Sequence, residues 1–335
     1  MAAQGAGARD GRLRDARDHA QSVRREFAMS DTFQIVHETF DEPDVVPITE
    51  ADFIEVQEAL RRLALVMQVE ETFDVAVSNY ADFERAVAGI LISRETRRDF
   101  SGVRWHSTRR EMSRAISNLL SSVRTFQHVA ESAVSAIYGP VVLDEHQQFK
   151  RRLYDGSFAY RVMEKLRNHA QHQGLAVNSQ TYSSRWIDLP EQKGRQRVQA
   201  FRPELDLREF AGFPKWKGIV AEFSAMRDAE PTTPERLDLH KLVRRYMTEQ
   251  SAIISELRQR WADDLDQWDR TVTVRRDLIP GRIGEQAITE TVAVQLRGDA
   301  RIKTLYVSRT LIGDIRHLEQ DNAPLLNLDK LEMRL

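Results

Sequence analysis

Apolar side chains recur every three or four residues through the middle of the chain, which is the spacing of an amphipathic helix. The clearest stripe consists of Met112, Ile116, Leu119, Leu120, Val123, Phe126, Ala130, Ala133, Val134 and Ile137. A capping box formed by Thr108 and Glu111 predicts where this helix begins, and the pair Gly139-Pro140 predicts where it ends. We therefore expect one long helix over 108–137.

A second stripe predicts another long helix, from about Asp144 to Gly174. Its apolar positions are Phe149, Leu153, Tyr160, Met163, Leu166 and Ala170. The pair Asp155-Gly156 lies inside this stretch and predicts a kink, because glycine lowers helix stability by on the order of 1 kcal/mol. Since only a short turn joins this helix to the first, the two are expected to pack antiparallel in a helical bundle.

The N-terminal segment predicts a tail, an extended stretch and two further helices. Residues 1–28 have almost no apolar content, so we interpret them as a disordered tail. Residues 30–47 have the pattern of extended chain. A helix is then expected to begin at Thr49, which is a good N-cap, and a second amphipathic helix is expected over 80–97.

Beyond residue 174 the pattern changes to that of an α+β region. A short hairpin is expected within 175–215, with its turn around Gln192-Lys193-Gly194. A long helix is predicted over 234–268, with Thr233 as its cap and Pro234 in its first turn. Strand-like alternation follows in three places, which are 271–274, 291–296 and 302–307, the last being either a third strand or the start of a final helix.

Composition narrows the class of protein. The chain has 335 residues, 49 lysines and arginines, 51 acidic residues, a net charge of −2 and no cysteine. The lack of cysteine excludes a disulfide scaffold and a cysteine nucleophile, and the charge balance confines any nucleic-acid surface to a local patch. No apolar run approaches the roughly 18 residues of a membrane span, and the lack of an apolar stretch near residue 1 argues against export. We therefore expect a cytoplasmic, mainly α protein without a membrane partner, with a helical bundle over 29–178 and a smaller α+β region over 179–335.

Several well-known catalytic motifs are missing from the sequence. It has no GxxxxGK[ST], no strand-linked GxGxxG, no HExxH and no GxSxG. These absences argue against a P-loop NTPase, a dinucleotide-binding fold, a zinc protease of that type and an α/β-hydrolase.

One polar segment stands out at the end of the second long helix, over residues 165–174. At 100° per residue, one arc of this helix carries Tyr160, Arg161, Glu164, Arg167, Asn168, Gln171 and His172. Asn168 and His172 are i,i+4 neighbours and can touch. Arg167 and His172 are not stacked, so they would need a shared ligand or the same helix from a second subunit.

This grouping suits phosphodiester chemistry. A histidine can take a proton from a ribose 2′-hydroxyl or give one to the leaving 5′-oxygen, so His172 is the candidate general acid or base. Arg167 is the candidate phosphate clamp, because a guanidinium binds phosphate bidentately, and Asn168 can orient either partner. The chemistry needs no metal, and we expect no cofactor.

Arg167, Asn168 and His172 resemble the Rx4–6H motif of the HEPN superfamily, in which a polar residue, often Asn, follows the arginine. The position of the motif at the end of the second of two long helices agrees with that family. The resemblance covers roughly 108–175, extends to the helices at 49–97 and says little about 176–335.

The resemblance implies a helical bundle that homodimerises and brings two copies of the motif into one cleft. It also implies a metal-independent endoribonuclease that leaves a 2′,3′-cyclic phosphate, of the kind found in toxin–antitoxin and antiviral defence systems. Under this interpretation Arg167, Asn168 and His172 are the catalytic residues. The partners are then RNA, a second copy of the chain, and an antitoxin or nucleotidyltransferase.

Other residues and other interpretations complete the sequence-based picture. Further candidates for substrate binding are Tyr160, Arg161, Lys165, Arg151 and Arg152. A non-catalytic HEPN-like module that dimerises and binds RNA or a protein is the main alternative, and an inhibitor or sensor subunit is another. Arg167 and His172 could also serve only the helix dipole, or His172 could pair with His169 on a metal.

Overall fold

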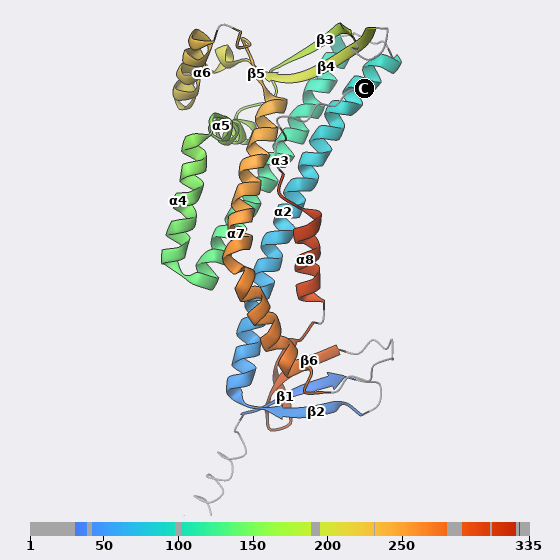
Figure 1. Cartoon of the computed structure of the whole chain (residues 1–335), viewed down its shortest axis with the longest axis vertical. Coiled ribbons are helices and arrows are strands. Elements are labelled where there is room, and N and C mark those ends of the chain that lie inside the picture. The colour runs from blue at the N-terminus through green and yellow to red at the C-terminus, as the bar shows by residue number, and fades with distance from the viewer. Residues whose placement is uncertain are drawn as a thin grey trace, which may run out of the picture. The chain divides into compact units, whose positions relative to one another are not determined.

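The computed structural model describes residues 31–38, 42–97, 102–188, 195–230, 232–279, 290–308, 310–325 and 328. The predicted tail over 1–28 and the turn at Gln192-Lys193-Gly194 lie outside these residues. The chain divides into two compact units (Figure 1). The first comprises Met1–Ala64 and Asp263–Asp314, and the second comprises Leu65–Ala262 and Ile315–Leu335.

The first unit contains a four-stranded antiparallel sheet with the strand order β2-β1-β6-β7. Its strands are β1 (Asp31–Glu38), β2 (Asp44–Ile48), β6 (Glu290–Arg297) and β7 (Ala300–Tyr306). Val36, Val292 and Val294 form a buried apolar cluster in this sheet. On the alternate positions of β1, Phe33 packs against Phe53, with ring centroids 5.1 Å apart. Burial on both sides of β1 therefore fixes its register against β6.

The two units do not coincide with the regions 29–178 and 179–335 expected from the sequence. The backbone of β1 bonds to β6, whose residues lie more than 250 positions later in the chain. A local pattern indicates that a segment is a strand but not which partner satisfies its hydrogen bonds. The extended segment that was grouped with the bundle therefore belongs to the sheet.

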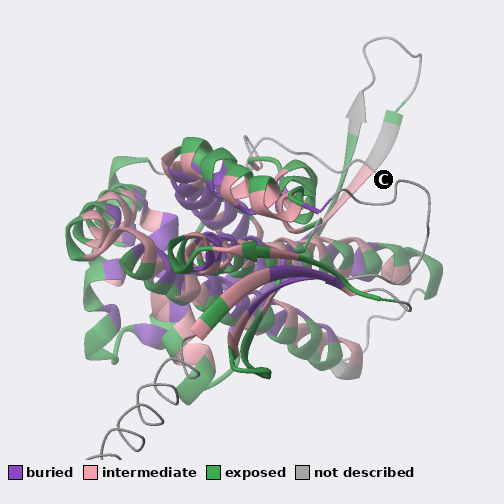
Figure 2. Cartoon of the chain, turned by 90° about the horizontal axis from the view of Figure 1, so that it is seen from below, coloured by how far each residue is buried: buried purple, intermediate pink, exposed green. Residues whose placement is uncertain are grey.

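The second unit is mostly helical. Its helical elements are the later part of α2 (Glu50–Arg97), α3 (Gly102–Tyr138), α4 (Pro140–Gly156), α5 (Phe158–His172), α6 (Lys217–Ala229), the earlier part of α7 (Leu239–Arg276) and the end of α8 (Leu311–Asp321). The short elements are β3 (Ser179–Asp188), β4 (Arg195–Leu205), β5 (Leu237–Asp238) and the 3-10 turns η1 (Leu207–Phe210) and η2 (Pro214–Trp216). Tyr246 and Trp261 of α7 are fully buried, and Phe73 of α2 packs on Phe126 of α3 with ring centroids 5.1 Å apart. Figure 2 shows buried positions along the inner sides of these long helices.

The mainly helical character predicted from the sequence is confirmed, but several helix boundaries differ. The segments expected at 49 and 80–97 are parts of one helix, α2, because buried Val69, Phe73 and Ala76 continue its stripe between them. The predicted stop after α3 is confirmed, since Gly139 has φ 84° and helix α4 starts anew at Pro140.

The predicted kink at Asp155-Gly156 is a complete break between α4 and α5. Ser157 is extended, with φ −119° and ψ 111°, and its hydroxyl accepts a hydrogen bond from the Tyr160 backbone N–H at 3.2 Å. A serine in this conformation is a favourable N-cap. A new helix therefore begins here, although the apolar spacing of the sequence continues across the break. The expected single helix over 144–174 is therefore wrong.

The C-terminal predictions were mixed. The hairpin is confirmed by β3 and β4, and the strands at 291–296 and 302–307 are confirmed by β6 and β7, with α8 following them. The long helix begins at Leu239 rather than 234, because Asp238 accepts hydrogen bonds from the backbone N–H groups of His240 and Lys241. It also runs through 271–274, which was expected as a strand, and Val272 there is buried.

Helix α6 and the two 3-10 turns were not predicted.

Across the described residues, no helix combines the length and the apolar composition that crossing a bilayer requires.

Candidate functional site

Helix α5 carries most of the residues that the sequence selected. Its buried positions, Ala159, Tyr160, Val162, Met163 and Leu166, anchor one side of the helix in the second unit. Because that side is fixed by packing, Asn168 and His172 on another side are exposed. Tyr160 was expected on the open arc, but only 3% of it is exposed.

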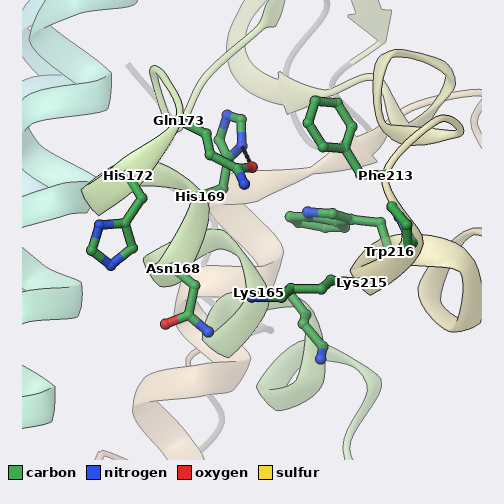
Figure 3. Close-up of a pocket in the computed structure, with 9 residues that line it drawn as sticks. Lys165, Asn168, His169, His172, Gln173, Phe213, Lys215 and Trp216 are labelled. Carbon is green, nitrogen blue, oxygen red and sulfur yellow. Dashed lines mark hydrogen bonds between the residues drawn. The ribbon is translucent and has the colours of Figure 1, made fainter.

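The C-terminal end of α5 forms one wall of a cavity of about 600 Å³, which we call the first cavity. It is lined by Lys165, Asn168, His169, His172, Gln173, Phe213, Pro214, Lys215 and Trp216. Figure 3 shows the α5 side chains on one side of the opening and Phe213 and Trp216 on the other. Two of the three predicted catalytic residues, Asn168 and His172, therefore meet in one cavity.

The aromatic wall of the first cavity is held firmly. Trp216 is 3% exposed and packs on Phe210 with ring centroids 4.4 Å apart. His169 meets Phe210 edge-on at 4.9 Å, and its Nδ1 lies 3.2 Å from Oε1 of Gln173. His169 thus belongs to the wall, whereas the imidazole of His172 has no hydrogen bond or ion pair with any described residue.

Asp206 fixes the turn that carries this wall. Its carboxylate accepts hydrogen bonds from the backbone and the side chain of Arg208. Asp206 thereby caps η1, the turn that ends at Phe210. The side-chain hydrogen bond from Arg208 lowers the pKa of Asp206 to about 2, even though burial opposes the shift. The backbone N–H of Asp206 also donates a hydrogen bond to Oδ1 of Asn178, at 2.7 Å.

Arg167, the predicted phosphate clamp, does not line the first cavity. Its guanidinium lies 3.1 Å from the Glu164 carboxylate, donates to Oδ1 of Asn168 at 3.1 Å, and is 13% exposed. Glu164 also accepts a hydrogen bond from the Tyr246 hydroxyl at 2.8 Å. Burial, together with the charge of Glu164, raises the pKa of Tyr246. Arg167 therefore lies outside the lining of the first cavity, and its guanidinium contacts Glu164 and Asn168.

A second cavity, of about 390 Å³, lies on another side of α5. It is lined by Arg124, Gln127, Glu131, Gln147, Lys150, Arg151, Tyr154, Tyr160 and Glu164. Two residues predicted to bind substrate, Arg151 and Tyr160, lie here, whereas Lys165 lies in the first cavity. The structure thus separates residues that the sequence placed in one site.

The remaining predicted residues have other surroundings. Arg161 donates to the carbonyl oxygens of Tyr154 and Asp155 and pairs with Glu222 of α6, so it fastens the break between α4 and α5. Arg152 is exposed, and its guanidinium carbon lies 5.7 Å from the centroid of the Phe149 ring. Neither arginine lines a cavity described above.

Sequence reasoning missed the wall opposite α5. The run Phe213-Pro214-Lys215-Trp216 interleaves aromatic and basic residues, which is a signal for nucleic-acid contact, but it is too short to mark a site by itself. Only the fold brings it to the end of α5.

As for a metal at His169 and His172, no group of three or more potential ligand side chains gathers within the described parts of the chain.

Comparisons of the chain with protein-family models, curated proteins and solved structures give no match. The interpretation of the site therefore depends on its residues and their geometry.

Proposed function

We propose that this chain binds RNA in the first cavity and cleaves it without a metal ion, by attack of a ribose 2′-hydroxyl that leaves a 2′,3′-cyclic phosphate. One observation carries the proposal, which is that Asn168 and His172 share a cavity with Lys165, Lys215 and an aromatic wall. Lysine side chains can neutralise phosphates, and aromatic rings can stack on bases.

The reaction assigns a role to each group. A neutral His172 imidazole accepts the 2′-hydroxyl proton as the 2′-oxygen bonds to phosphorus, and the bond from phosphorus to the 5′-oxygen breaks. The leaving oxygen takes a proton from a second, protonated imidazole. Because His169 is committed to the aromatic wall, we assign that second group to His172 of another copy of the chain, in the HEPN-like homodimer that the sequence resemblance implies.

The geometry changes the role proposed for Arg167. Its ion pair with Glu164 and its hydrogen bond to Asn168 favour a positioning role, in which it fixes the Asn168 side chain at the cavity. Lys165 and Lys215 then supply the positive charge that meets the phosphate. A toxin or antiviral defence effector, controlled by an antitoxin or a nucleotidyltransferase partner, remains the biological setting that we propose.

The test is an RNA cleavage assay with His172→Gln beside a matched histidine variant. The wild-type protein should cut single-stranded RNA in the presence of EDTA and leave cyclic phosphate ends. His172→Gln should lower the rate by about 10²–10⁴-fold, the usual contribution of a general acid or base. His317→Gln, which changes an exposed histidine of α8 outside both cavities, should retain the wild-type rate. Equal rates for both variants would contradict the proposal.

A second candidate function is a non-catalytic module that dimerises and binds RNA or a protein. The ion pair that occupies Arg167 favours it, because the arginine is not available as a clamp in this arrangement. Under this alternative the chain binds RNA, leaves it intact, and loses binding when Lys165 and Lys215 are changed together to glutamine. Sedimentation of the wild type gives the oligomeric state that both candidates require.

A further inference from the structure

The aromatic wall of the first cavity offers one accessible ring. Trp216 and the Phe210 ring on which it packs are each only 3% exposed, whereas Phe213, which lines the same cavity, is 39% exposed. The backbone N–H of Phe213 donates to the Phe210 carbonyl, and its own carbonyl accepts from the Trp216 N–H, both at 2.9 Å. Phe213 is therefore the ring of this wall that can stack on a planar group, and its backbone is fixed.

Gln173 presents a hydrogen-bond donor to the same cavity. It directly follows the last residue of α5, and its side-chain Oε1 lies 3.2 Å from Nδ1 of His169. Because an amide oxygen can only accept, Nδ1 carries the proton of this bond. Figure 3 draws the bond as a dashed line, with the amide nitrogen of Gln173 turned away from the imidazole. The oxygen is thus occupied, and the NH₂ group is left to meet a ligand.

The imidazole that orients Gln173 is itself held by its neighbours. Phe210 meets the ring of His169 edge-on at 4.9 Å, and Trp216 does so at 6.5 Å. A Cβ added at Gly174 would lie only 3.2 Å from Nε2 of His169, so the glycine leaves room for the ring. The carbonyl of His169 also accepts from the backbone N–H of Gln173 at 2.8 Å. The donor of Gln173 therefore has a fixed direction.

A fixed N–H donor beside a stacking ring discriminates between bases by their exocyclic groups. Uracil and guanine present a carbonyl oxygen where cytosine and adenine present an amino group. The amide NH₂ pairs with the carbonyl oxygen, but it meets an amino group donor against donor, which leaves both groups without a hydrogen bond. The arrangement therefore favours a keto base over an amino base.

We infer that Phe213 and Gln173 form a base subsite of the first cavity, which selects uracil and guanine over cytosine and adenine. Phe213 stacks on the base, and Gln173 donates a hydrogen bond to its carbonyl oxygen. The inference rests on the proposed function in taking RNA as the ligand of this cavity, but it does not require the cleavage step. Phe213 also lies outside 108–175, the range of the HEPN resemblance, so the resemblance does not imply this selectivity.

Fluorescence anisotropy with the full-length protein tests the selectivity separately from cleavage. The probes are short single-stranded oligomers of uridine and of cytidine with 2′-O-methyl riboses, which the proposed reaction cannot cleave, and an abasic strand of the same length. Wild type should bind the uridine oligomer about 2–10-fold more tightly than the cytidine oligomer, the range of one neutral hydrogen bond. The abasic strand should bind more weakly than either.

Gln173→Glu exchanges the donor for an acceptor, so it should reverse the preference. The carboxylate accepts from an amino group, and the cytidine oligomer should then bind about 2–10-fold more tightly than the uridine oligomer. Both should bind more weakly than to wild type, because an added negative charge meets the phosphates. Gln171→Glu is the matched control, since it adds the same charge at an exposed position of α5 that does not line the cavity, and it should keep the wild-type ratio.

Phe213→Leu removes the ring and keeps an apolar side chain. It should weaken binding of both base-containing oligomers about 5–100-fold and leave the abasic strand within about twofold of wild type. Phe149→Leu changes a half-buried ring of α4 that does not line the cavity, so it should retain the wild-type affinities. Circular dichroism confirms that each variant is folded.

The outcomes separate this inference from the proposed cleavage. Equal affinities of wild type for the uridine and cytidine oligomers, or a ratio that Gln173→Glu leaves unchanged, overturn the selectivity. A loss in Phe213→Leu that the abasic strand shares overturns the stacking role. Failure to bind any oligomer overturns both the subsite and the proposed RNA binding, whereas selective binding by a protein that never cleaves RNA contradicts the cleavage alone.

Discussion

The two cavities flank the same helix and both present cations, but they differ in the groups that exchange protons near neutral pH. The first cavity contains two imidazoles and two lysines, and the second contains two arginines and one lysine. Histidine titrates in the physiological range, whereas arginine keeps its charge. The first cavity therefore contains imidazoles that can exchange protons near neutral pH, whereas the arginines of the second cavity keep their charge.

The cavities also differ in how their aromatic walls are built. Trp216 of the first cavity is part of the hydrophobic core, while Tyr154 of the second is only half-buried. Loss of a ring that belongs to the core lowers the stability of the fold as well as changing the cavity, whereas loss of a half-buried ring affects stability much less. The following predictions test this contrast, beginning with the largest effect.

Trp216→Ala should destabilise the protein far more than Tyr154→Ala. Loss of the buried indole removes its packing on Phe210 and leaves a void, which costs about 3–5 kcal/mol, whereas the tyrosine variant should cost about 1–2 kcal/mol. Urea unfolding followed by far-UV circular dichroism measures both. Equal losses would contradict the contrast between a core wall and a surface wall.

Glu164→Gln should destabilise the protein by about 2–3 kcal/mol. The substitution leaves the largely buried Arg167 guanidinium without its carboxylate, and breaking such a pair is more harmful than replacing both partners. The double variant Glu164→Gln with Arg167→Met should therefore lose less stability than the sum of the single variants. Strict additivity in denaturant unfolding would show that the two side chains act independently.

Asp206→Asn should lower stability near pH 6 by about 1–2 kcal/mol, because the amide can still cap η1 but loses the charged contact with Arg208. The pKa of Asp206 is lowered from 3.8 to about 2, so its contribution is present above pH 4 and is lost as the pH falls towards 2. The difference between wild type and variant should therefore shrink from pH 6 to pH 3 in urea unfolding. A difference that grows towards acid pH would reverse the sign of this effect.

The smallest expected difference concerns Arg152 and Arg161, the two predicted substrate-binding arginines that line neither cavity. Arg161→Met should cost about 1 kcal/mol, because its bonds join the α4–α5 break to α6, and Arg152→Met should change stability by less than about 0.5 kcal/mol. Thermal unfolding of the two variants side by side is sufficient. An equal response would mean that the α4–α5 break needs no such fastening.

Local patterns predicted the helices and strands better than they predicted their partners. The stop at Gly139-Pro140 and the strand at 291–296 depend on short-range preferences, and both are confirmed. The pairing of β1 with β6 depends on contacts between distant segments, which one sequence read along its length does not reveal. The break at Ser157 was hidden because the apolar spacing continues across it.

The same limit applies to the candidate site. Helical spacing correctly placed Asn168 and His172 on an accessible side of α5, since that follows from 3.6-residue periodicity. It placed Tyr160 there as well, and could not foresee that α3 and α7 bury this ring. The ion pair of Arg167 with Glu164 was compatible with the sequence, because the residues are i,i+3 neighbours, but the fold of α7 supplies the Tyr246 hydroxyl that completes it.

The series from Tyr246 through Glu164 and Arg167 to Asn168 has an evolutionary consequence. Glu164 lines the second cavity and Asn168 lines the first, so a substitution of Arg167, which contacts both, disturbs both cavities. Homologous chains that replace the glutamate should therefore replace the arginine in the same lineage, and the two cavities should diversify together rather than separately.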